Sequence, residues 1–248
     1  MYKKRLYRNS VFNKDLVKFS VEYYESNLLI CAKRDLSKTA RDWLIYFHNQ
    51  ISDYIKNNPQ FEKILRPVKL DKKAPAIIKA MTRACQKANV GPMATVAGTI
   101  AEYVGKKLLK LSPEIIVENG GDIFICVKRK RRVGIFAGVG SIYNNLALLL
   151  KAKDCPCGIC TSSGNFGHSL SFGKSQATVV ICKSAPLADG YATAIGNMVN
   201  TQKDIAAALA LAKQKKEIKS YPFRAIYIFF HKRFIKNLVF LKILMILR

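Results

Sequence analysis

The sequence predicts an α+β fold, with mixed sheets and packed helices in a single compact domain or in two closely associated lobes. Strand-like and helix-like segments are mixed along the chain without a regular β-α alternation, which argues against a doubly wound sheet. Half of the 248 residues are hydrophobic, which is enough to bury one substantial core. Two uncharged runs, 133–150 and 155–173, approach the ~20 residues that a membrane-spanning helix needs, but glycines and polar residues interrupt both, so we expect no transmembrane segment.

The first half of the chain is predicted to contain one or two strands followed by helices. Apolar and polar residues alternate over 18–31, with a break near Ser26-Asn27. Apolar residues then recur at helical spacing in three segments, and the Gly91-Pro92 break separates the last two. The predicted helices cover 37–57, 75–87 and 93–111.

The second half of the chain is richer in short apolar segments. A basic run at 128–132 lies between two of them and is interpreted as a solvated hairpin tip. Residues 155–173 are rich in Cys, Ser and Gly, and no strand or helix is assigned to them. Strands are predicted over 114–117, 123–127, 133–137, 146–150 and 178–182, and helices over 187–200 and 204–216.

The last residues differ in composition from the rest. Residues 221–248 contain six Lys or Arg, no acidic residue and no Gly. We therefore divide the chain into a domain at 1–218 and an atypical basic, hydrophobic tail at 219–248. We expect this tail to form no strand of the central sheet, because its charges would be unpaired on a buried face. An interfacial amphipathic helix is the alternative.

The net charge of +26 is the strongest bulk feature. The basic residues are spread over nearly every segment, which predicts non-specific association and not specific nucleic-acid binding. The seven cysteines are an odd number and favour free thiols in a reducing compartment. The first residues lack the apolar stretch of a secretory signal, so we expect a cytoplasmic protein.

A turn and a polar loop supply most of the candidate binding residues. Asn-Gly at 119–120 is a strong hairpin signal, and its adjacent glycines expose N–H groups to an approaching phosphate or carbonyl. Residues 161–174 contain five hydroxyl side chains, three glycines, one histidine and one lysine. This composition suits a nucleotide-binding loop with His168 as a general base. An ordinary polar surface loop is the alternative.

Two further groups of residues could carry chemistry. Asp189 and Thr193 lie four residues apart near a predicted helix start, so their oxygens share a face and could bind Mg²⁺. The alternative is that Asp189 caps the helix. Three cysteines lie within six residues but lack a fourth ligand, so we expect no bound metal; redox or sulfur chemistry stays open. These cysteines are Cys155, Cys157 and Cys160.

Four motifs, in this order, resemble the short ApbE-like proteins, an uncharacterised branch of the ApbE flavin transferase superfamily. The similarity runs from about residue 5 to residue 218. The motifs are Val-Gly-Pro-Met-Ala-Thr-Val-Ala-Gly at 90–98, Glu-Asn-Gly-Gly-Asp-Ile-Phe at 118–124, the polar stretch at 161–174, and Ala-Asp-Gly-Tyr-Ala-Thr-Ala-Ile-Gly-Asn at 188–197.

The resemblance implies an enzyme that binds a flavin nucleotide. ApbE proteins cleave FAD in a Mg²⁺-dependent step and transfer FMN to a Thr or Ser hydroxyl of an acceptor protein. By resemblance, Asp189 and Thr193 hold the metal and His168 activates the acceptor hydroxyl. A homodimer is compatible with this assignment. The candidate cofactor-binding residues are Asn119, Gly120, Gly121, Asp122, Thr161, Ser162, Ser163 and Gly164.

Several departures from the family pattern leave other functions open. Among them, Ala97-Gly98 stands where ApbE proper has Lys-Gly, and Ser26-Asn27 stands where Thr-Asp is usual. The first alternative is a non-transferase accessory protein in sulfur assimilation into homocysteine that uses the cysteine cluster at 155–160. The second is a degenerate, inactive member of the family.

Overall fold

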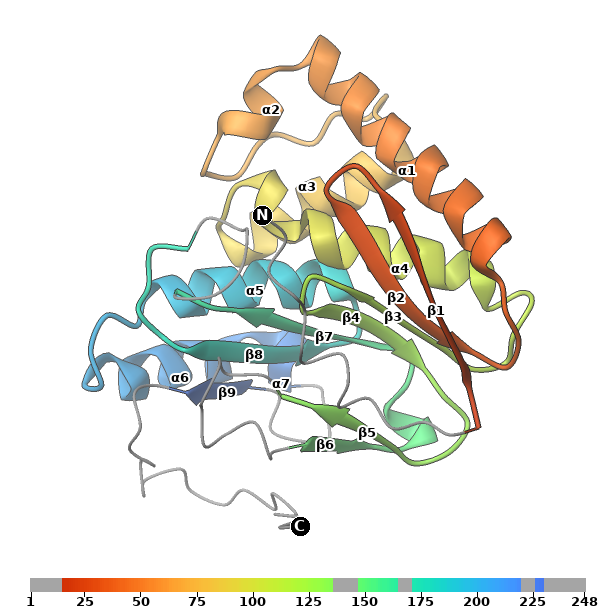
Figure 1. Ribbon diagram of the computed structural model, residues 1–248. Coiled ribbons are helices and arrows are strands. Elements are labelled where there is room, and N and C mark those ends of the chain that lie inside the picture. The colour runs from red at the N-terminus through yellow and green to blue at the C-terminus, as the bar shows by residue number, and fades with distance from the viewer. Residues whose placement is uncertain (1–14, 136–146, 165–170, 220–225, 230–248) are drawn as a thin grey trace.

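Antiparallel strands form the central sheet of the computed structural model, which describes residues 15–135, 147–164, 171–219 and 226–229 (Figure 1). Within these residues the sheet has seven strands in the order β1-β2-β3-β4-β7-β8-β9, and β5 pairs with β6 in a separate two-stranded sheet. The strands are β1 (Val17–Tyr23), β2 (Ser26–Ala32), β3 (Ile115–Asn119), β4 (Asp122–Cys126), β5 (Arg131–Gly134), β6 (Ala147–Leu150), β7 (Cys157–Ser162), β8 (Ala177–Cys182) and β9 (Ile226–Phe229).

Helices α1, α3, α4 and α5 lie over one face of this sheet, and the β5–β6 pair lies on its other side (Figure 1). The core forms where the helices meet the sheet, as in the apolar stripe that α1 buries at Ala40, Leu44, Phe47 and Ile51. The α-helices are α1 (Ser37–Asn57), α2 (Gln60–Lys63), α3 (Ala76–Ala88), α4 (Val96–Leu108), α5 (Ala185–Asn197), α6 (Asp204–Gln214) and α7 (Lys216–Lys219). Two short 3-10 helices are labelled η2 (Pro92–Thr95) and η4 (Ala152–Asp154).

The observed elements confirm the predicted α+β class. None of the helices in the described ranges is long and apolar enough to cross a membrane. Most predicted segments form within a few residues of their expected bounds, because each has a clear apolar period. Strand β7 was not predicted, since its sequence Cys-Gly-Ile-Cys-Thr-Ser is poor in typical strand residues. Its glycine has a packing role: a Cβ at Gly158 would lie 2.2 Å from the Cα of Ala185 in α5.

The basic run at 128–132 is not a hairpin tip, which corrects the sequence interpretation. Strand β4 pairs with β3 and β7, whereas β5 pairs with β6, so the run connects two sheets. Lys128, Arg129 and Lys130 are exposed, but Arg131 is buried. A buried guanidinium requires charged partners, which the local sequence does not provide.

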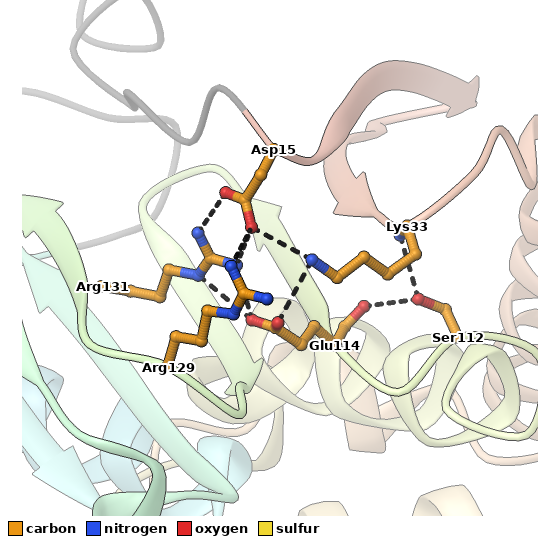
Figure 2. A network of polar contacts seen from close by, with 6 residues as sticks. All are labelled: Asp15, Lys33, Ser112, Glu114, Arg129 and Arg131. Carbon is orange, nitrogen blue, oxygen red and sulfur yellow. Dashed lines mark hydrogen bonds and ion pairs between the residues drawn. The ribbon is translucent and has the colours of Figure 1, made fainter.

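Distant carboxylates supply those partners (Figure 2). Arg131 Nη2 lies 2.7 Å from Glu114 Oε2 and 2.8 Å from Asp15 Oδ2. Lys33 Nζ lies 3.0 Å from Asp15 Oδ2 and 3.4 Å from Glu114 Oε1. Glu114 precedes β3 and Asp15 precedes β1, so this network, with Arg129 at its edge, ties both strands to the start of β5.

The expectation that 221–248 contributes no strand is wrong for four residues. Ile226–Phe229 forms β9, which pairs antiparallel with β8 at the edge of the sheet, with Ala177 opposite Phe229. The four residues Ile-Tyr-Ile-Phe are β-branched or aromatic and carry no charge, so the penalty for burying charge does not apply to them. Residues 220–225 and 230–248 lie outside the described residues.

Candidate functional site

A tight turn joins β3 to β4 at the predicted place, with Gly-Gly and not Asn-Gly at its central positions. Asn119 pairs with Asp122 across the turn, and the two residues between them are Gly120 at φ 66° and Gly121 at φ 107°. Positive φ at both central positions is the type I′ geometry that matches the twist of a hairpin. The N–H of Gly121 donates to Glu118 Oε1 at 2.8 Å. The double glycine is therefore required by the backbone.

The end of β7 lies beside this turn. Asp122 Oδ1 accepts a hydrogen bond of 3.2 Å from the N–H of Thr161, and a Cβ at Gly121 would lie 4.0 Å from the Thr161 carbonyl oxygen. The contact arises because β4 and β7 pair antiparallel, with Ile123 opposite Ile159. The fold thus brings together the start of the polar loop and the Asn-Gly-Gly-Asp turn.

The first turn of α4 joins the same region to Asp189. Asp189 is 8% exposed, and its Oδ2 accepts a 2.9 Å hydrogen bond from the N–H of Gly98. The Asn119 side-chain amide donates to the carbonyl of Ala97 at 3.3 Å. A Cβ at Gly98 would lie 3.0 Å from the Asp189 Cβ, so glycine permits this close approach.

The start of α5 differs from the sequence prediction. The helix begins at Ala185, with Pro186 in its first turn, where the missing N–H of proline has no cost. Asp189 is therefore its fifth residue and bonds to the first turn of α4 instead of capping α5. The α5 N-terminus is capped from α4: Glu102 Oε2 accepts from the N–H of Ala185 at 2.6 Å. Each helix supplies a carboxylate to the other helix's N-terminus.

Two carboxylates of the site are buried near one another. Burial raises the pKa of Asp189 from 3.8 to about 7, although the Gly98 N–H acts in the opposite direction. Burial and the charge of Asp189 raise the pKa of Asp122 well above its usual range. Burial, followed by the charges of Asp122 and Asp189, raises the pKa of the Cys160 thiol. A cation would stabilise the ionised carboxylates, so this charge distribution fits a metal ion.

The described ranges contain no group of three or more His, Cys, Asp or Glu that could hold a metal ion. A cation at Asp189 would therefore need other oxygens, such as hydroxyl, backbone carbonyl, water and phosphate. Thr193 lies four residues further along α5 and is half-buried. Mg²⁺ commonly keeps several non-protein ligands, so this sparse set of side chains is compatible with it.

Close glycine contacts occur at the two described ends of the polar loop, on either side of residues 165–170. A Cβ at Gly164 would lie 1.8 Å from the Gly173 carbonyl oxygen, and one at Gly173 would lie 1.9 Å from that of Gly196. The N–H of Gly164 donates to the Ser175 carbonyl at 3.0 Å. Ser162 lies alongside, with its Oγ 3.4 Å from a Cβ built at Gly196. Ser163 follows it in the chain.

His168 lies outside the described residues, so its catalytic assignment stays a prediction. The structure describes the chain on both sides of the gap at 165–170 that contains His168. Gly164 precedes the gap, and after it the N–H of Phe172 donates to Asn197 Oδ1 at 2.9 Å. Asn197 ends α5, the helix that carries Asp189 and Thr193.

The three cysteines of the 155–160 cluster do not converge. Cys160 Sγ donates to the carbonyl of Ala185 at 3.3 Å, on the α5 side of the sheet. Cys157 is fully buried at the start of β7, and Cys155 is partly exposed just before it. All seven cysteines are free thiols. Cys160 is thus separate from the other two thiols of the cluster, Cys155 and Cys157.

Sequence reasoning did not identify four residues that organise the site. Ala97 and Gly98 were within a family motif, but their contacts with Asn119 and Asp189 link segments far apart in sequence. Asn197, the last residue of another motif, proves to anchor the loop. Glu102 gave no signal, because an acidic residue on a helix usually faces solvent.

Known structures share this fold. The flavinyl transferase ApbE of Pseudomonas stutzeri matches with a TM-score of 0.53 and 13% identity, over 78% of this chain and 87% of that one. The flavin transferase ApbE of Vibrio cholerae matches with a TM-score of 0.51 and 13% identity, over 79% and 90%. The chain therefore has the fold of the ApbE flavin transferases.

Sequence comparison gives the family. The profile of the family described as "AbpE bacteria" matches residues 8–217, so the chain belongs to this ApbE-like family. A UPF0280 protein of Methanococcus vannielii is 38% identical over 209 residues, which are 83% of this chain and 85% of the relative. One of Methanothermobacter thermautotrophicus is 43% identical over 159 residues, which are 64% of this chain and 61% of the relative.

Proposed function

We propose that this protein is a flavin transferase that binds FAD with Mg²⁺ and transfers FMN to a Thr or Ser hydroxyl of an acceptor protein. Support comes from one convergence above all. Four separate segments of the chain meet there. Asp122 accepts a hydrogen bond from Thr161, and Asp189 accepts one from Gly98. The two carboxylates are close enough for the charge of Asp189 to raise the pKa of Asp122. Membership in an ApbE-like family and the ApbE fold also support a flavin transferase function.

The residues have distinct roles in this proposal. The two glycines of the turn at Asn119–Asp122 carry no side chain and let the flavin nucleotide approach closely, and the hydroxyls of Thr161, Ser162 and Ser163 bind it. Asp189 and Thr193 hold the cation. Mg²⁺ bound there would neutralise charge on the pyrophosphate of FAD. His168 accepts the proton of the acceptor hydroxyl, whose oxygen bonds to the FMN phosphorus as AMP leaves.

FAD cleavage without a known acceptor tests the proposal. Water can replace the acceptor hydroxyl, so incubation with FAD and Mg²⁺ should release AMP and FMN, and chelation of Mg²⁺ should stop the reaction. Asp189→Asn should lose at least tenfold in rate, whereas Asp42→Asn, at an exposed position on α1, should match the parent. Cleavage by Asp189→Asn at the parental rate would remove the metal assignment. FAD left intact by folded parent protein would remove the transferase proposal.

A further inference from the structure

Three thiols gather where β4 ends and β7 begins, at the other end of β4 from the Asn-Gly-Gly-Asp turn. Cys126 is the last residue of β4 and Cys157 the first of β7, and the register places Ile125 opposite Cys157. Cys155 lies two residues before Cys157. The proposed flavin site does not use this group.

The sheet separates Cys160 from the other thiols of its cluster. Successive residues of a strand point to opposite faces, so Gly158 and Cys160 share one face and Cys157 takes the other. The face of Gly158 and Cys160 is the one that packs against Ala185 of α5. Cys155 belongs with Cys157, because the two side chains are hydrogen-bonded to each other.

Cys155 has the properties of a reactive thiol. It is partly exposed, so a small reagent can reach it, whereas Cys157 beside it is fully buried. Hydrogen bonding from Cys157 lowers the pKa of Cys155, outweighing the effect of burial, and the Val127 backbone adds to the lowering. The pKa values of Cys126 and Cys160 are raised instead, chiefly by burial. A thiolate is the nucleophilic form, so Cys155 should react before either of them.

We propose that Cys155 and Cys157 form a redox-active thiol pair that reacts with hydrogen peroxide. The Cys155 sulfur attacks one peroxide oxygen, the O–O bond breaks, and Cys155 becomes a sulfenic acid as one water leaves. The Cys157 sulfur then attacks the Cys155 sulfur, the S–O bond breaks, and a disulfide forms as a second water leaves. The two thiols lose two electrons and two hydrogens, which reduce one H₂O₂ to two waters.

A disulfide between Cys155 and Cys157 would close a ring across a single intervening residue, Pro156. Strained disulfides are more reducible, so a small dithiol should return the pair to its reduced form, which permits a reversible cycle.

Peptide mapping of the parent protein tests the pair directly. The reduced protein is treated with one equivalent of H₂O₂, its remaining thiols are alkylated, and each cysteine is located by mass spectrometry. We expect a Cys155–Cys157 disulfide that dithiothreitol reverses, with the other five cysteines alkylated. Cys155 left reduced, joined to Cys126 or Cys160, or converted to sulfinic acid beside a reduced Cys157 would overturn the proposal.

Serine variants separate the two roles. In Cys157→Ser, oxidised Cys155 should stop at the sulfenic acid and be trapped by dimedone, whereas Cys155→Ser should leave Cys157 reduced. Cys160→Ser is the matched control from the same strand and should form the disulfide as the parent does. A sulfenic acid trapped on Cys157 in Cys155→Ser would contradict the assigned order. FAD cleavage is not measured in these experiments, so their outcome is independent of the flavin transferase proposal.

Discussion

The Asp189 carboxylate accepts a 2.9 Å hydrogen bond from the N–H of Gly98 in the first turn of α4. Glu102 reciprocates by accepting from the N–H of Ala185 at the start of α5. The pair of contacts fixes the two helices side by side in the layer that covers the sheet (Figure 1). The position of Asp189 is therefore set by both helices, as its proposed role as a metal ligand requires.

Asp189→Asn should change how stability depends on pH when divalent cations are removed. Burial raises the pKa of Asp189 from 3.8 to about 7, so the folded state keeps a proton that the unfolded state releases between these values. Stability of the parent should therefore fall as pH rises from 4 to 7, by up to about 1.4 kcal/mol per pH unit from this group.

The asparagine amide can still accept from Gly98 but does not ionise, so the variant should lose this part of the decline. Chemical denaturation at several pH values in EDTA measures it, with Asp42→Asn as the control that should keep the parental slope. Identical slopes in the parent and Asp189→Asn would show that the carboxylate ionises in the folded state as freely as in water.

Glu102→Ala should destabilise the fold by about 1–2 kcal/mol, because the first N–H of α5 loses its acceptor. Glu102→Gln keeps an acceptor oxygen and should lose less. Lys106→Met tests the other bond of Glu102, that to Lys106 Nζ at 2.6 Å, and should cost under ~1 kcal/mol because Lys106 is 56% exposed. Equal losses for Ala and Gln, measured by urea denaturation, would contradict the capping role.

Arg131→Met should cost about 3–5 kcal/mol, because it leaves the buried Glu114 carboxylate without its guanidinium partner. Arg132→Met, at the exposed neighbouring position, should change stability by less than about 0.5 kcal/mol. Thermal and urea unfolding compare the two. Similar effects at both positions would mean that the network in Figure 2 contributes little.

The same network should make the protein sensitive to acid. Hydrogen bonds from Arg131 and then Lys33 hold the pKa of Asp15 well below its usual range. Burial raises the pKa of Glu114, but Arg131 and Lys33 outweigh it and the net shift is downward. Stability from both groups is present at neutral pH and is lost as pH falls below the usual carboxyl range. Arg131→Met should lose less stability than the parent between pH 5 and 3; an equal loss in both would contradict the assignment.

Gly158→Ala should be more damaging than Gly120→Ala. The added Cβ at Gly158 would lie 2.2 Å from the Ala185 Cα, so α5 must move away from β7 at a cost of about 1–3 kcal/mol or more. At Gly120 no atom lies within 4 Å, and only the positive φ of 66° opposes alanine, at about 1–2 kcal/mol. A larger loss at Gly120, by denaturant unfolding, would refute the close packing of α5 on β7.

The parts of the fold that sequence predicts are those with local causes. The helix Ser37–Asn57 follows from its apolar period, and the Asn119–Asp122 turn follows from two adjacent glycines, which supply the positive φ that a tight hairpin needs. Strand β7 was missed because its place in the sheet depends on its neighbours β4 and β8 and not on its own composition.

The contacts that organise the site have no local cause. Glu102 and Ala185 are 83 residues apart, and Gly98 and Asp189 are 91 apart. Arg131 was assigned to an exposed basic run because its partner Asp15 is 116 residues away. Pairing of buried charges is a property of the folded chain, so a single sequence reveals the candidate residues but not which of them meet.

Flavin retention tests the central claim most directly. Purified protein is mixed with FAD and either Mg²⁺ or EDTA, and the visible spectrum is recorded after gel filtration. We predict flavin absorbance in the protein peak with Mg²⁺ and its loss with EDTA or in Asp189→Asn. A folded, colourless protein peak under all conditions would contradict a flavin site at Asn119–Asp122, Thr161–Gly164 and Asp189.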